Sequence, residues 1–234
     1  MKIKTKNMKC IKLYFLSLFV GLSLCAQSQD WAELNHYKED NKEIGLPSKG
    51  ENRVVFMGNS ITAGWVGAMP EFFKGKPYIG RGIGGQTTPQ MLIRFRQDVI
   101  HLKPKVVVIL AGTNDIAGNT GPSTLEMIED NIASMSELAE SNGIKVILSS
   151  VLPVYVYPWK PEVKPIDQII ALNHWLKDYA EKNGHIYLDY YSSMVDERLG
   201  MKSEYSADGV HPNQIGYKVM GVLVEIAIAS TLKK

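Results

Sequence analysis

Five short apolar runs, separated by segments with a helical pattern, constrain the fold of this chain more than any other feature. Most of them are continuously apolar and rich in β-branched residues, as in parallel strands that are covered on both faces. Strands that alternate with helices along the whole chain indicate an α/β fold, a three-layer α/β/α sandwich around a mostly parallel five-stranded sheet. The predicted strands span 53–57, 105–111, 144–152 and 185–191, with a weaker one at 76–80.

Helical patterns fill the segments between these runs. One helix is predicted to begin after Thr88, with Pro89 at its first position. Another opens with the sequence STLE at 123–126, a capping box, and continues to Gly143. The remaining helices are predicted over 165–184 and 213–232, and over 31–43, where the helix would pack outside the sheet.

The first 28 residues are typical of a secretory signal peptide, with a basic start, an apolar run over 13–25 and a small-residue exit at 26–28. A permanent membrane anchor needs about 20 apolar residues, so the apolar run over 13–25 is too short to be one. Leu24 stands before Cys25 where a lipoprotein signal has a small residue, so lipidation is not expected. We therefore expect an exported protein, periplasmic or secreted, whose residues 29–234 form a single domain.

Removing this signal changes the charge and the cysteine count. The mature chain keeps 21 Lys and Arg against 24 Asp and Glu, a net charge of −3, and no basic patch indicates a nucleic-acid partner. Cys10 and Cys25 both lie in the signal. The mature chain therefore has no disulfide and no thiol nucleophile.

Besides the aromatic loop YVYPWKP (155–161), four polar clusters follow predicted strands or precede predicted helices. Each has a purely structural interpretation: a helix cap, a tight glycine turn, an Asx-turn and a β-turn. The glycine cluster does not have the spacing of a dinucleotide-binding loop. In chain order the clusters are GNSIT (58–62), GIGGQTT (82–88), AGTND (111–115) and DGVHP (208–212).

Together the clusters supply every role that a serine hydrolase needs. Ser60 is the candidate nucleophile at a strand end, and His211 is the candidate base. A turn at DGVH would let Asp208 reach Nδ1 of His211 and leave Nε2 free to take the serine proton. Donors for the oxyanion could be the backbone N–H groups of Ser60 and Gly85 and the carboxamide of Asn114.

The four clusters, in this order, resemble the conserved blocks of the SGNH (GDSL-type) esterases, and the resemblance extends from about Arg53 to Gly216. It leans toward the branch with platelet-activating-factor acetylhydrolase-like and carbohydrate acetylesterase proteins. It implies a flavodoxin-like sheet, no cofactor and the same five site residues in the same roles. One departure is Asn59, where the family usually has Asp. No metal site is expected, because no His or acidic residues lie at metal-ligand spacing.

The function expected from these features is that of an exported esterase that removes short acyl groups, most plausibly acetyl, from carbohydrate. The loop 154–165 could offer Tyr155, Tyr157 or Trp159 as a stacking surface for sugar rings, or could be a packed lid without substrate contact. Two alternatives remain: a lipid deacylase of the lysophospholipase or platelet-activating-factor acetylhydrolase type, and a catalytically silent carbohydrate-binding module. The sequence does not indicate an oligomeric state.

Overall fold

The structure of the protein is a computed structural model that describes residues 30–233. The described residues from Ala32 onward form one compact unit. The predicted signal peptide and both cysteines lie outside the described residues. Export and the domain boundary at residue 29 therefore remain predictions.

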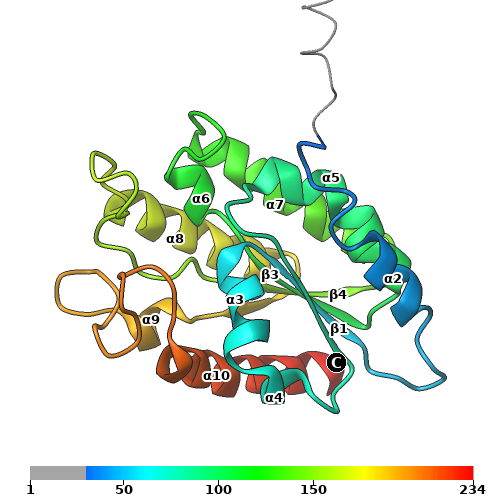
Figure 1. Cartoon of the computed structure of the whole chain (residues 1–234). Coiled ribbons are helices and arrows are strands. Elements are labelled where there is room, and N and C mark those ends of the chain that lie inside the picture. Colours follow the sequence, from blue (N-terminus) through cyan, green and yellow to red (C-terminus); the bar gives the residue numbers. More distant parts are fainter. Residues whose placement is uncertain (1–29, 234) are drawn as a thin grey trace, which may run out of the picture. The chain divides into compact units, whose positions relative to one another are not determined.

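A five-stranded parallel sheet in the order β2-β1-β3-β4-β5 lies at the centre of this unit (Figure 1). Every residue of β1 and β3, two of the three inner strands, is buried, which agrees with their continuously apolar sequences. The predicted fold class is confirmed. The strands are β1 (Val54–Gly58), β2 (Tyr78–Gly82), β3 (Val106–Leu110), β4 (Lys145–Ser149) and β5 (Ile186–Leu188).

The last two strands are shorter than predicted, because side chains take over the hydrogen bonds beyond their ends. The side-chain amide of Asn173 in α8 (Ile166–Lys182) accepts from the N–H of Val151 at 2.7 Å and donates to the carbonyl of Val151 at 3.0 Å. The Ser150 hydroxyl accepts from the N–H groups of Tyr190 and Tyr191. The apolar runs 144–152 and 185–191 therefore leave the sheet at Ser149 and Leu188.

Helices cover both faces of the sheet (Figure 1). The apolar faces of α5, α7 and α8 pack against one side, around Phe95, Ile132 and Leu172. On the other side, α3 and α10 pack around Trp65 and Val224. The helices not yet given are α2 (Lys38–Ile44), α3 (Ser60–Ala68), α4 (Pro70–Phe73), α5 (Thr88–Asp98), η1 (Ile100–Leu102), α6 (Thr113–Ile116), α7 (Leu125–Glu140), α9 (Tyr191–Met194) and α10 (Gln214–Lys233).

Three predicted helix starts are corrected. The capping box lies at Thr87, which exchanges hydrogen bonds with Gln90, so α5 already begins at Thr88. α7 is capped by Thr124, whose hydroxyl accepts from the N–H of Met127, and not by a box at 123–126. The N-terminal helix is only α2, because Glu33 adopts a positive φ of 55° that interrupts a helix over 31–43.

Among the described residues, α10 is one helix that is long and apolar enough to cross a membrane, as judged by length and composition. Its residues Val224 and Ile228 are buried in the core beside the sheet. This packing is that of a core helix in a globular domain.

Candidate active site

Ser60 lies at the carboxyl end of the inner strand β1, as predicted. The strand ends at Gly58, Asn59 follows as the N-cap, and Ser60 is the first residue of α3. The Asn59 carboxamide oxygen accepts from the N–H of Ile61 at 3.0 Å, so Asn59 caps the helix that carries the serine.

Two glycines allow α3 to begin this close to the sheet. A Cβ on Gly58 would lie 2.1 Å from the hydroxyl oxygen of Thr62. A Cβ on Gly82, at the end of β2, would lie 2.2 Å from the backbone nitrogen of Ala63. Because both contacts involve the first turn of α3, these glycines fix where Ser60 emerges.

The structure brings Ser60, His211 and Asp208 together in a hydrogen-bonded chain. Ser60 Oγ lies 2.9 Å from Nε2 of His211. On the other side of the ring, Nδ1 lies 2.7 Å from Oδ2 of Asp208. The chain can carry a proton from the serine hydroxyl to the imidazole, whose charge the carboxylate then balances.

A tight turn holds Asp208 in this position. Its Oδ1 accepts from the N–H groups of Val210 at 2.9 Å and His211 at 2.8 Å. Burial alone would raise the pKa of Asp208, but the hydrogen bonds from the backbone and side chain of His211 and from Val210 outweigh it. The pKa of Asp208 is therefore well below its usual range, and the carboxylate stays ionised beside the imidazole.

The three predicted oxyanion donors lie on neighbouring turns. The Ser60 N–H is the first of α3, so it has no partner within that helix. Gly85 lies in an exposed turn with a φ of 74°, which favours glycine. Asn114 in α6 donates one amide hydrogen to the carbonyl of Gln86 at 2.9 Å, and its second amide hydrogen is available to a ligand.

Asp115 ties the GTND segment to the glycine turn. Its carboxylate accepts from the N–H of Thr88 at 2.9 Å and from the Thr88 hydroxyl at 2.6 Å. Burial raises the pKa of Asp115 to about 6, and the hydrogen bonds from Thr88 oppose that shift. The sequence reveals Asp115 only as part of an Asx-turn.

The aromatic loop divides into one buried ring and two exposed ones. Tyr157 is fully buried, and its hydroxyl donates to the Thr113 carbonyl at 2.9 Å. Its expected use as an exposed stacking surface is therefore wrong. Tyr155 and Trp159 are 52% and 41% exposed. The Trp159 ring lies 6.1 Å from that of His211, between centroids.

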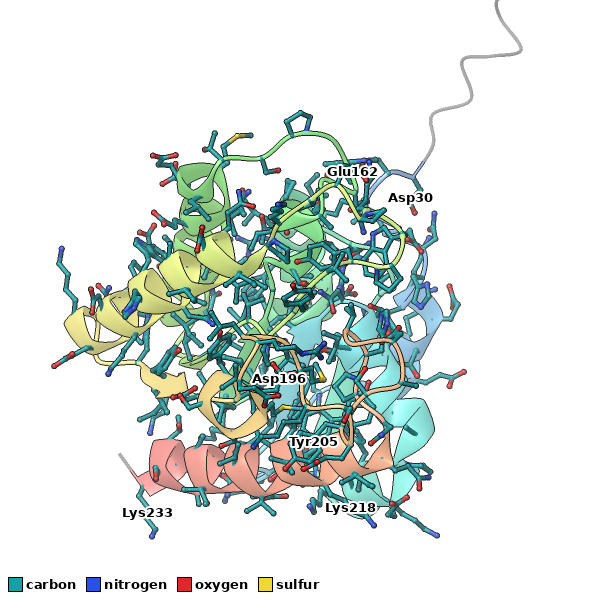
Figure 2. The ribbon with its side chains drawn as sticks, turned by 90° about the vertical axis from the view of Figure 1, so that its left-hand side faces the viewer. Asp30, Glu162, Asp196, Tyr205, Lys218 and Lys233 are labelled. Atoms are coloured by element: carbon teal, nitrogen blue, oxygen red, sulfur yellow. The ribbon has the colours of Figure 1, made fainter. Side chains whose placement is uncertain are left out.

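The triad and the aromatic loop lie on an open surface. The side chains of His211 and Asp208 are 39% and 42% exposed. Figure 2 shows the segments that carry Glu162, Asp196 and Tyr205, which leave β4 and β5, on one face of the described chain. This openness can admit a bulky alcohol or a polymer to the serine.

Within residues 30–233, no group of three or more His, Cys, Asp or Glu side chains is arranged to hold a metal ion. The absence of a metal or cofactor from the reaction remains a prediction. One network behind the site was missed: Arg94 and Asp98 on α5. Their spacing from Met91, at i+3 and i+7, places both charged residues on the apolar face of the helix. Charged residues on that face are the sequence feature that indicates a buried network.

The sequence profile of the GDSL-like lipase/acylhydrolase family matches residues 56–219, a span that contains the whole triad. The chain belongs to this family. The resemblance inferred from the four sequence clusters is therefore confirmed.

Solved structures agree with this family assignment. A candidate acylhydrolase from Bacteroides fragilis is 52% identical, covers 88% of this chain and all of its own, and has a TM-score of 0.86. A GDSL-like lipase from Bacteroides thetaiotaomicron is 48% identical over 86% of this chain and 99% of its own, with a TM-score of 0.84.

An acetylxylan esterase from Xylanibacter ruminicola is 26% identical in an alignment that covers 80% of this chain and 45% of that protein. The chain spans about half the length of the first curated relatives it matches, 52% of one and 45% of the other.

Proposed function

We propose that the protein is an exported serine esterase that removes short acyl groups, acetyl above all, from carbohydrate. The single observation that carries this proposal is the chain of hydrogen bonds from Ser60 through His211 to Asp208, at 2.9 and 2.7 Å. That geometry couples a hydroxyl to a base and the base to an ionised carboxylate, which is the arrangement for acyl transfer.

The reaction proceeds in two steps. Ser60 Oγ attacks the ester carbonyl carbon while its proton passes to Nε2 of His211. The intermediate expels the alcohol, which takes that proton, and the acyl group stays on Ser60. Water then attacks the acyl-enzyme with His211 as base, which releases the carboxylic acid and restores the serine.

The N–H groups of Ser60 and Gly85 and the free amide hydrogen of Asn114 bind the oxyanion in both steps. Each such donor is worth about 3 kcal/mol when it is preorganised. Asn114 is held for this role by its hydrogen bond to Gln86, and Asn59 fixes the first turn of α3, which begins at Ser60, by accepting from the N–H of Ile61.

Three observations support a carbohydrate substrate. A relative that matches 80% of this chain is an acetylxylan esterase. The triad is open to solvent, so it can receive an acyl group carried by a polymer. Trp159 presents an exposed ring beside His211, and Tyr155 is a second exposed ring on the same loop; aromatic rings are suited to stacking on sugars.

The exposed side chain of Val156, on the same loop as these two rings, also favours a lipid deacylase as a second candidate. The two functions differ in the acyl chain that they accept. Each added methylene that finds no pocket forfeits about 0.8 kcal/mol of burial.

A rate series on p-nitrophenyl acetate, butyrate and octanoate, beside acetylated xylo-oligosaccharide, tests the proposal. We expect p-nitrophenyl acetate to be cleaved about tenfold faster than p-nitrophenyl octanoate. We also expect acetate to be released from the acetylated oligosaccharide. Ser60→Ala is the control for background hydrolysis. An optimum at eight carbons, with no acetate release, would establish the lipid function instead.

A further inference from the structure

Arg94 on α5 is a fully buried cation behind the candidate site. One guanidinium nitrogen, Nη2, donates to the carbonyl oxygens of Gly58 and Arg81, both at 2.9 Å. Nε donates to the Gln86 carboxamide oxygen at 2.6 Å, and Nη1 lies 3.0 Å from the carboxylate of Asp98. Every nitrogen of the guanidinium therefore has a partner.

Three of these partners belong to segments that carry the proposed chemistry. Gly58 ends β1 two residues before Ser60, and Arg81 lies in β2, whose end leads into the glycine turn. Gln86 follows Gly85 directly, and its carbonyl accepts the amide hydrogen that orients Asn114. One planar group thus joins the nucleophile's strand to the turn that offers the oxyanion donors.

The buried charge is costly, so its retention needs a reason beyond packing. Burial lowers the pKa of Arg94, and Asp98 four residues along the helix opposes that shift. An apolar pair in these positions would serve the core equally well. A lysine could balance the charge of Asp98. Its ammonium group is a compact point charge, however, and could not hold three acceptors at fixed angles as the planar guanidinium does.

We propose that Arg94 is a positioning residue for this esterase. Through its hydrogen bonds to Gly58, Arg81 and Gln86, it sets where the first turn of α3, which carries Ser60, lies relative to the turn that carries Gly85. This inference rests on the proposed function, because it assigns the two turns to one reaction. The guanidinium touches neither substrate nor the reacting atoms, so it acts through the geometry of the two turns.

The chain offers a matched control at the opposite end of β1. Arg53 is also buried, and its Nη1 donates to the carbonyls of Gly45 at 2.7 Å and Leu102 at 2.9 Å. It differs from Arg94 in position, because it precedes the first residue of the strand whereas Arg94 contacts the last. Arg53→Lys and Arg94→Lys therefore make the same chemical change at the two ends of one strand.

The experiment compares both variants with wild type in three measurements: thermal unfolding, kcat and KM for p-nitrophenyl acetate, and hydrogen exchange of peptides that cover 58–61 and 82–87. We expect both variants to unfold at lower temperature. Only Arg94→Lys should lose kcat, by about tenfold to a hundredfold, because small misplacements of reacting groups cost that much. The KM of Arg94→Lys should change less than its kcat. The backbone amides of 58–61 and 82–87 should exchange faster in Arg94→Lys and not in Arg53→Lys.

Equal kcat and equal exchange in the two variants would overturn the inference. If Arg94→Lys does not fold, Gln86→Met removes one arm of the network, and unchanged kcat and exchange there would overturn it as well. Absence of esterase activity in wild type would contradict the proposed function alone, because the exchange comparison still reports whether Arg94 holds the two turns.

Discussion

The ring of Trp159 lies 6.1 Å from the imidazole of His211, between centroids, with an angle of 35° between their planes. Its indole N–H donates to Asn119 at 3.2 Å, and Asn119 in turn donates to the carbonyl of Gly85 at 3.3 Å. In the proposed reaction His211 protonates the departing alcohol, so this position of Trp159 predicts that its ring borders the alcohol.

Trp159→Ala should raise KM for acetylated xylo-oligosaccharide by about tenfold, because a stacking ring contributes roughly 1 kcal/mol or more to sugar binding. The change for p-nitrophenyl acetate should be smaller, since its alcohol is small. Trp159→Phe keeps an aromatic ring but loses the hydrogen bond to Asn119 and part of the stacking area, so it should restore part of the affinity. Equal effects of Trp159→Ala on both substrates would contradict a role in alcohol binding.

Asn114→Ala should lower kcat by about 10²–10³ with a smaller change in KM, the pattern of a donor used mainly in the transition state. Steady-state kinetics on p-nitrophenyl acetate measure this. Because Asn114 also donates to Gln86, circular dichroism should accompany the kinetics to show that the fold is kept. A variant with raised KM and unchanged kcat would make Asn114 a substrate-binding residue.

Asn59→Ala should lower the free energy of unfolding by about 1 kcal/mol, because it removes the cap of α3. Asn59→Asp keeps an acceptor for the N–H of Ile61, so its kcat should stay within about threefold of wild type. Urea unfolding and turnover measure the two effects. A large gain in kcat for Asn59→Asp would show instead that a charge beside the nucleophile contributes to catalysis.

Asp115 should make the protein less stable as pH rises from about 4 to about 6. Its pKa is raised from 3.8 to about 6 in the fold, so between these values the folded state binds more protons than the unfolded state. The shift corresponds to about 3 kcal/mol of unfolding free energy, which is present at acid pH and lost above pH 6.

Unfolding by urea at several pH values, in wild type and Asp115→Asn, isolates this group. The difference in unfolding free energy between the two proteins should change across that range. Asp208, whose pKa is lowered, acts in the opposite direction at lower pH and is common to both. A difference that does not depend on pH would contradict the raised pKa.

The sheet could be predicted because its signal is local. β1 and β3 consist of apolar residues in unbroken runs, and such runs need no knowledge of their partners. The ends of β4 and β5 could not be predicted in the same way. They depend on Asn173 and Ser150, whose bonds join residues 22 to 41 positions apart in the chain.

In the candidate site, as in the sheet, the residues that could be predicted are those with a local sequence pattern. Ser60, His211 and Asp208 stand in recognisable turns, and the fold brings them within hydrogen-bond distance. Tyr157 was misjudged because its burial depends on a bond to Thr113, 44 residues away. Arg94 was missed because its partners come from three segments that meet only in the folded chain.

Labelling with an organophosphate, followed by peptide mass spectrometry and measurement of the turnover of Ser60→Ala, shows whether Ser60 is the nucleophile. We expect one adduct, on Ser60, and a loss of turnover of about 10³-fold or more in the variant, with the fold intact because Ser60 is only half-buried at the first position of α3. An adduct on another serine, or turnover of Ser60→Ala within about tenfold of wild type, would contradict it.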